Sequence, residues 1–151
     1  MEQSAFFEQV RKHFRYLESY GFGIAYEEIF TGFDNAEVVF QSEKCRIRVL
    51  LERGEVYVDI GPLPPTEYWV DLAILVEFLT QGAETWQYEI PTGDYQFRVE
   101  WQLARVANKL RHYILQACEM FSIENFEHKR LELERFKQQR LLKRWGNHID
   151  R

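Results

Sequence analysis

The sequence predicts a single α+β domain: an N-terminal helix, a four-stranded antiparallel meander, and then three helices packed on one face of the sheet. Apolar residues recur at helical spacing near both ends of the chain, but alternate with polar residues between positions 24 and 60. The connections between the alternating segments are too short for parallel crossovers. A chain of 151 residues, 46% of them hydrophobic, is long enough to form one domain over residues 1–151 without a disulfide or a metal.

The first element expected is a helix from Gln3 to Tyr20. Its apolar side chains recur every three or four residues and therefore share one helical face: Phe6, Val10, Phe14 and Leu17. Gly21 and Gly23 follow directly, and glycine commonly ends a helix because it adopts the left-handed conformation without strain. The N-terminal segment is therefore expected to lay one helix against the core.

Four strands are expected next, at residues 24–31, 36–41, 45–52 and 55–60. The turn sequence Gly32-Phe33-Asp34-Asn35 separates the first two, and Arg53-Gly54 forms a tight hairpin between the last two. Alternation is cleanest in the last two strands, where one face is apolar and the other is charged. The apolar side chains expected to pack beneath helices are Val38, Phe40, Ile47, Val49, Val56 and Val58.

Three helices are expected after the proline-rich residues 62–65, at residues 68–81, 95–121 and 123–145. Thr66 is a suitable N-cap for the first of them, and its buried stripe would include Trp69. The second is long, with a heptad-like apolar seam. The centre of that seam is expected to face the strands: Leu103, Val106 and Leu110.

The composition favours a soluble, cytoplasmic protein with no membrane attachment. The longest apolar stretch, residues 69–79, is too short to cross a bilayer, and residues 1–10 lack the basic start and apolar run of an export signal. The chain has two cysteines, Cys45 and Cys118. In a reducing compartment both are expected to be buried free thiols rather than a disulfide.

No residue pattern identifies an active site, so no catalytic residue, metal ligand or cofactor is predicted. The one strand-to-helix turn, residues 60–66, holds one glycine and three prolines, and proline has no N–H to offer a phosphate. Glu124 and His128 lie one helical turn apart, a spacing that ordinary surface pairs share. The alternative is an enzyme whose site converges from distant segments, such as His13 or His112 with Cys45.

The outer face of the sheet is one candidate binding surface. Arg46 and Arg48 alternate along one expected strand, and Glu55, Tyr57 and Asp59 alternate along its neighbour. One interpretation is that these residues form cross-strand salt bridges. The other is a polar recognition surface with the tyrosine as an aromatic anchor.

The basic C-terminal helix is the other candidate, with Arg140, Arg144 and Trp145 as binding residues. Residues 127–151 carry eight Lys or Arg against four Asp or Glu, whereas residues 1–126 carry eleven against twenty. This polarity favours docking of the helix on an acidic surface, in its own copy, a second copy or another protein. Nucleic-acid binding is disfavoured, because the basic residues are scattered around the helix and the pI is about 5.4.

The sequence therefore predicts a non-catalytic protein–protein interaction module of the adaptor or inhibitor type. Its partner would be another protein or a second copy of the chain. Two alternatives are retained from other classes. One is an enzyme with a site assembled from distant segments, and the other is a nucleic-acid-binding protein that uses the C-terminal helix.

Overall fold

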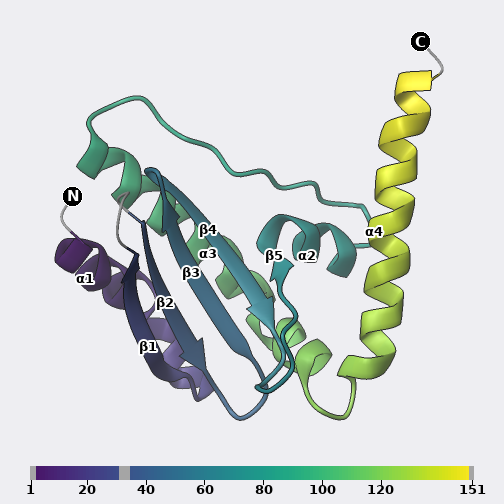
Figure 1. Cartoon of the computed structure of the whole chain (residues 1–151), viewed down its shortest axis with the longest axis horizontal. Coiled ribbons are helices and arrows are strands. Elements are labelled where there is room, and N and C mark those ends of the chain that lie inside the picture. Colours follow the sequence, from purple (N-terminus) through teal and green to yellow (C-terminus); the bar gives the residue numbers. More distant parts are fainter. Residues whose placement is uncertain (1–2, 31–34, 150–151) are drawn as a thin grey trace.

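The computed structural model describes residues 3–30 and 35–149 and has an α+β fold, an N-terminal helix, an antiparallel sheet and C-terminal helices (Figure 1). The expected turn at residues 32–35 lies outside the described residues except for Asn35. The elements in chain order are α1 (Gln3–His13), the 3₁₀ helix η1 (Arg15–Tyr20), β1 (Gly23–Phe30), β2 (Asn35–Gln41), β3 (Arg46–Glu52), β4 (Glu55–Gly61), β5 (Val70–Asp71), α2 (Leu72–Leu79), α3 (Tyr95–Phe121) and α4 (Phe126–Ile149).

The sheet has five strands in the order β1-β2-β3-β4-β5, so the prediction of four strands was one short. The added strand, β5, pairs antiparallel with β4 through Asp59↔Asp71 and Ile60↔Val70. This pairing also delays the helix that was expected to begin at Tyr68. The side chain of Asp71 accepts a hydrogen bond from the Ala73 N–H at 2.8 Å, so Asp71 is the N-cap of α2 in place of Thr66.

The N-terminal helix is also divided differently from the prediction. The α-helical part, α1, ends at His13, and η1 continues the chain to Tyr20 as a tighter 3₁₀ helix. The Leu17 N–H donates to the Phe14 carbonyl at 3.0 Å, which is the three-residue spacing of that helix type. Phe14 and Leu17 are both fully buried, so the tighter turn keeps both side chains on the core face.

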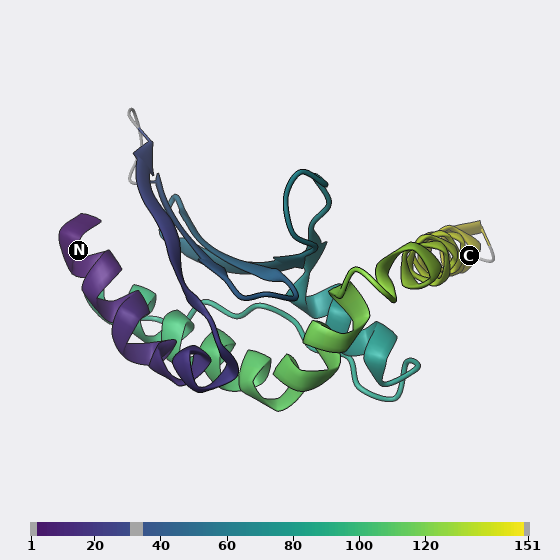
Figure 2. The same ribbon diagram turned by 90° about the horizontal axis from the view of Figure 1, so that it is seen from below.

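In the part of the chain that the structure describes, helices cover one face of the sheet (Figure 2). Figure 2 shows α1 and α3 below the sheet, while the opposite, outer face has no helix over it and is flanked by the loop between β4 and β5. The helix α4 lies beside the sheet, where it packs on α2 and α3. No helix among the described residues is both long and apolar enough to cross a membrane.

The core forms between the inner face of the sheet and α1, α2 and α3. All six predicted strand residues are buried, as are Leu103, Val106 and Leu110 of α3, so this prediction is confirmed. Figure 1 shows α3 running behind the strands along much of the sheet. The predicted bounds of α3 are likewise correct, and Asp94 caps it by accepting a hydrogen bond from the Phe97 N–H at 2.9 Å.

Gln102 connects α3 to the β3–β4 hairpin. Its amide accepts a hydrogen bond from the Val56 N–H at 3.0 Å and donates to the Gly54 carbonyl at 2.9 Å. The side chain is buried, so both backbone groups would lose a partner without gaining water if it were removed.

We expect Gln102→Leu to lower the free energy of unfolding by about 1–2 kcal/mol, because it leaves buried backbone groups unpaired. Gln96→Leu is the matched control, since Gln96 is an exposed residue of the same helix. Urea unfolding of both variants measures the difference. Equal stability of the two variants would contradict the role of Gln102.

The last helix is shifted from the predicted residues 123–145 to Phe126–Ile149. Residues 122–125 form a turn instead, in which the Asn125 side chain donates to the Glu119 carbonyl at the end of α3 at 2.9 Å. The helix also continues past Gly146, where it was expected to stop. Glycine within a helix costs only about 1 kcal/mol relative to alanine, so it does not by itself end one.

Candidate interaction surfaces

Arg46 lies on the outer face as predicted, but it is a structural residue. Its guanidinium donates to the Pro62 carbonyl at 2.8 Å and to the Thr66 carbonyl at 3.0 Å, and the residue is only 6% exposed. These bonds hold the loop between β4 and β5 against the sheet. Gly61, the last residue of β4, permits the close approach, because a Cβ there would collide with the Tyr68 carbonyl oxygen.

Arg48 pairs with Asp59 on the neighbouring strand. Its Nε and Nη2 atoms lie 3.1 and 2.7 Å from Asp59 Oδ2, which confirms the cross-strand salt bridge that the alternation suggested. Trp69 covers the pair: its ring centroid is 4.3 Å from the Arg48 guanidinium and 4.6 Å from that of Arg46. Trp69 therefore lies on the outer face, not on the buried stripe of a helix as predicted.

Tyr57 and Glu55 are hydrogen-bonded to each other on β4. This bond raises the pKa of Tyr57 to about 12, so the phenol stays protonated in neutral solution. The Tyr57 ring also packs edge-on against Tyr88, 5.0 Å between centroids. The predicted anchor is thus held among its own neighbours.

Tyr88 and Asp71 complete the polar network at the edge of β4. The Tyr88 hydroxyl donates to Asp71 Oδ2 at 2.8 Å and lies 3.2 Å from the Val58 carbonyl. Burial raises the pKa values of both Tyr88 and Asp71. The Tyr88 hydroxyl therefore provides a hydrogen-bond partner for the backbone of Val58. The strand β5, only two residues long, pairs with Asp59 and Ile60 instead.

The strand β1 forms the other edge of the sheet and is largely exposed. Four of its large apolar side chains are between 39% and 46% exposed: Ile24, Tyr26, Ile29 and Phe30. The register shifts between Ile24 and Tyr26, and Glu27 and Glu28 follow. An irregular, acidic edge is one way in which proteins avoid pairing with another strand.

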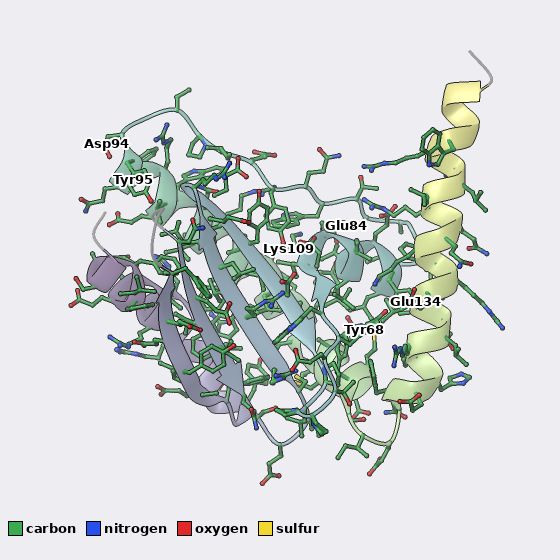
Figure 3. The ribbon with its side chains drawn as sticks, in the orientation of Figure 1. Tyr68, Glu84, Asp94, Tyr95, Lys109 and Glu134 are labelled. Atoms are coloured by element: carbon green, nitrogen blue, oxygen red, sulfur yellow. The ribbon has the colours of Figure 1, made fainter. Side chains whose placement is uncertain are left out.

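One basic side chain of α4, that of Arg140, pairs with the acidic body of the same chain. Arg140 Nε lies 2.6 Å from the Glu77 carboxylate on α2, so this predicted binding residue is engaged internally. Figure 3 shows Glu134 of α4 pointing toward Tyr68, and the Tyr68 hydroxyl donates to its carboxylate at 2.5 Å. Arg144 and Trp145 lie beyond this contact and are exposed.

Most of the large apolar side chains of α4 point away from the body. Leu133 is fully buried and Phe136 packs edge-on against Phe78 of α2, 5.5 Å between ring centroids. On the opposite side of the helix lies a row that we call the outward face of α4, made of Leu131, Gln138, Leu141, Leu142 and Trp145. Its four apolar members are 56–69% exposed. In the sequence, these four apolar residues were recognisable only because they lie off the helical face that Leu133 and Phe136 share.

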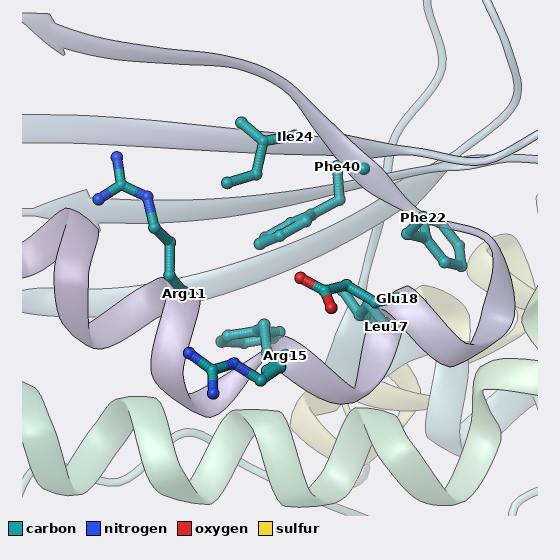
Figure 4. A pocket seen from close by; sticks show the side chains of 9 residues that line it. Arg11, Arg15, Leu17, Glu18, Phe22, Ile24 and Phe40 are labelled. Carbon is teal, nitrogen blue, oxygen red and sulfur yellow. The ribbon is translucent and has the colours of Figure 1, made fainter.

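The hollows among the described residues include three whose lining bears on function. The smallest of these three, about 160 Å³, lies between the N-terminal helices and β1–β2 and is lined in part by Phe14 and Phe40. Figure 4 shows Arg11, Arg15 and Glu18 around it. Its volume is below the range of roughly 300–1,000 Å³ usual for ligand pockets. Arg11 is also paired with Glu27 at 2.6 Å, which places this charge at the edge of β1.

The other two hollows meet at Leu115 of α3, which is 67% exposed. One, about 460 Å³, is a groove among α2, α3 and α4 lined by Phe78, Met120 and Lys129. The other, about 290 Å³, is lined by Tyr20, Gly21, Ser42, Glu43, Lys44, Leu115 and Cys118. Cys118 contributes to the wall of this hollow, and its Sγ atom lies 3.7 Å from Cys45 Sγ. Both cysteines are buried and free, as predicted.

A further polar cluster lies on the loop after α2. The Glu84 carboxylate is 2.5 Å from Lys109 Nζ and accepts a hydrogen bond from Tyr113, both on α3 (Figure 3). These two contacts lower the pKa of Glu84. They fasten the loop to the helix.

Two of the histidines make contacts within their own helices. His112 Nδ1 lies 2.8 Å from the Asn108 carbonyl, and His128 Nε2 lies 3.0 Å from the Glu132 carboxylate. Within residues 3–30 and 35–149, no group of three His, Cys, Asp or Glu side chains has the arrangement of a metal site.

Sequence reasoning missed Trp69, Tyr88, Asp71 and Gln102 as organising residues, because each acts through a partner far along the chain. Comparisons with protein-family models, curated proteins and solved structures found no match. The geometry of these surfaces is therefore the basis for inferring a function.

Proposed function

We propose that the protein is a non-catalytic protein-binding module and that the outward face of α4 is its contact surface. The observation that carries this proposal is the exposure of Leu131, Leu141, Leu142 and Trp145 in one row. Single exposed apolar residues are common, but a row that includes a tryptophan is typical of a protein contact. The other candidate surface, on the sheet, is less suited to this role. Its residues Arg46, Arg48 and Tyr57 already form hydrogen bonds with other residues of the same chain.

The spacing along this face suits a second helix. Leu131, Gln138 and Trp145 are seven residues apart, and Leu141 falls between the last two, which is the pattern of a coiled-coil seam. A single polar residue within such a seam commonly sets the register of the pair. Two antiparallel copies of α4 centred on Gln138 would place Leu131 of each against Trp145 of the other.

The charges of α4 favour this antiparallel arrangement with a second copy of the chain. Residues 126–134 hold three carboxylates and two basic side chains, whereas residues 135–149 hold five basic side chains and no carboxylate. A parallel pair would align the two basic halves, but an antiparallel pair places each basic half beside a mixed half. The contact is closed by a two-fold axis, as in most homodimers.

Light scattering on the full chain over roughly 1–100 μM tests this proposal, because dimer formation depends on concentration. We expect a dimer for the natural chain, and at least about a tenfold weaker dimer for the Leu142→Ser/Trp145→Ser variant. Leu115→Ser/Ile123→Ser is the matched control, since these residues are 67% and 82% exposed but lie outside α4. A natural chain that stays monomeric, or equal weakening by both double variants, would overturn the proposal.

A mixed cross-link tests the orientation. When Leu131→Cys chains are mixed with Trp145→Cys chains, both also carrying Cys45→Ser and Cys118→Ser, oxidation should join the two variants, because the antiparallel register places these positions against each other. Circular dichroism confirms that the variants fold. Disulfides that form only between two chains of the same variant would rule out the antiparallel register.

A further inference from the structure

The two cysteines are 73 positions apart in the chain but adjacent in space. Cys45 directly precedes β3, and Cys118 lies in the last turns of α3. Their sulfur atoms are 3.7 Å apart, with Cys45 fully buried and Cys118 7% exposed. A disulfide has an S–S distance of about 2.05 Å, so a modest side-chain rotation is needed to bring the sulfurs into bonding distance.

The two thiols differ in their access to small solutes. Cys118 forms part of the wall of the 290 Å³ hollow, together with Ser42, Lys44 and Leu115. Cys45 lies behind it, with its backbone N–H donating to Ser42 Oγ at 3.2 Å. A small oxidant that enters the hollow therefore meets Cys118 first.

The surroundings also make Cys118 the more reactive of the pair. The hydrogen bond from Cys45 lowers the pKa of the Cys118 thiol, and the nearby Lys44 ammonium lowers it further, although burial and Glu119 oppose this. The same hydrogen bond raises the pKa of Cys45, which stays protonated. Thiolates are the nucleophiles in thiol oxidation, so the pair has one attacking and one resolving sulfur.

We propose that Cys118 and Cys45 form an oxidisable dithiol site whose substrate class is small hydroperoxides. The Cys118 thiolate attacks one peroxide oxygen and breaks the O–O bond, and with one proton this yields a sulfenic acid and water or an alcohol. The Cys45 sulfur then attacks the Cys118 sulfur, the S–OH bond breaks, and the hydroxyl leaves as water with the Cys45 proton. The two thiols lose two electrons in total, the peroxide gains them, and a disulfide joins the start of β3 to the end of α3.

Hydrogen peroxide added to the reduced full-length protein tests this site. We expect the intact mass to fall by about 2 Da and both thiols to disappear, with reversal by a dithiol reductant. Peptide mapping without reduction should recover Cys45 and Cys118 in one cross-linked product. Thiols that react only after denaturation, or only between different molecules, would overturn the proposal.

Single substitutions separate the two roles. In Cys45→Ser, Cys118 should stop at the sulfenic acid, which a dimedone reagent traps, whereas in Cys118→Ser the remaining thiol should react much more slowly. Lys44→Gln should slow disulfide formation roughly two- to fivefold, because the thiolate loses a stabilising charge. Lys12→Gln is the matched control, an exposed lysine on α1. Equal oxidation of Cys45 and Cys118 in the two serine variants would contradict the order of attack.

Discussion

Replacing Leu110 with alanine is expected to lower the free energy of unfolding by about 2–5 kcal/mol, the largest loss among the changes considered for this protein. Leu110 is fully buried in α3 and belongs to the core cluster that also contains strand residues and residues of the N-terminal helices. Truncation removes apolar contacts and leaves a cavity that the surrounding close-packed side chains fill only in part.

Leu115→Ala is the matched control, because it makes the same chemical change five residues along the same helix. Leu115 is 67% exposed, so its truncation should change stability by less than about 0.5 kcal/mol. Urea unfolding followed by circular dichroism measures both variants, and unchanged m-values would show that the unfolding transition is the same. A small loss for Leu110→Ala would mean that this side of α3 does not face the core.

Arg46→Met is expected to cost about 2–4 kcal/mol, because two backbone carbonyls each lose a charge-assisted hydrogen bond. Methionine fills similar space and keeps the apolar stem of the side chain. The Pro62 and Thr66 carbonyls would then have no partner from β3, and Trp69 would lose one of the two guanidinium groups beside it. The loop between β4 and β5 should therefore detach from the sheet.

Two further variants make this result specific. Arg46→Lys keeps the charge but lacks the planar fork that reaches both carbonyls, so it should recover less than half of the loss. Arg15→Met changes an exposed arginine away from α4 and should leave stability within about 0.5 kcal/mol of the natural chain. Hydrogen exchange gives an independent readout, because amides in residues 62–69 should exchange faster in Arg46→Met alone. Unchanged exchange there would show that the loop is held by other contacts.

The strands and α3 could be predicted from the sequence because their signals are local. Alternation in residues 45–60 follows directly from the two-residue period of a strand with one buried face. The extent of α3 likewise follows from an apolar seam that lies within one segment. The first helix was predicted too long as an α-helix, because an apolar stripe fits both an α-helix and a 3₁₀ continuation over one turn.

Predictions failed where a distant segment competed for the backbone. Thr66 and Tyr68 have the local chemistry of a helix start, but Val70 and Asp71 pair with β4 and postpone the helix. The same event moves Trp69 to the outer face. The sequence of residues 62–71 does not indicate that β4 has an edge available for pairing. The start of α2 therefore depends on a strand that lies about ten residues earlier in the chain.

The sequence by itself determined the type and order of most elements, the apolar face of the sheet, the alternation of charges on its other face, and the polarity between body and C-terminal helix. Only the tertiary structure decided which of those charged side chains are paired within the chain and which side chains remain exposed for binding. It engages Arg46 and Arg140 internally, leaves Trp145 exposed, and brings Cys45 beside Cys118. The physical reason is that periodicity and capping are set by neighbours within a few residues, whereas burial and pairing depend on contacts across tens of residues.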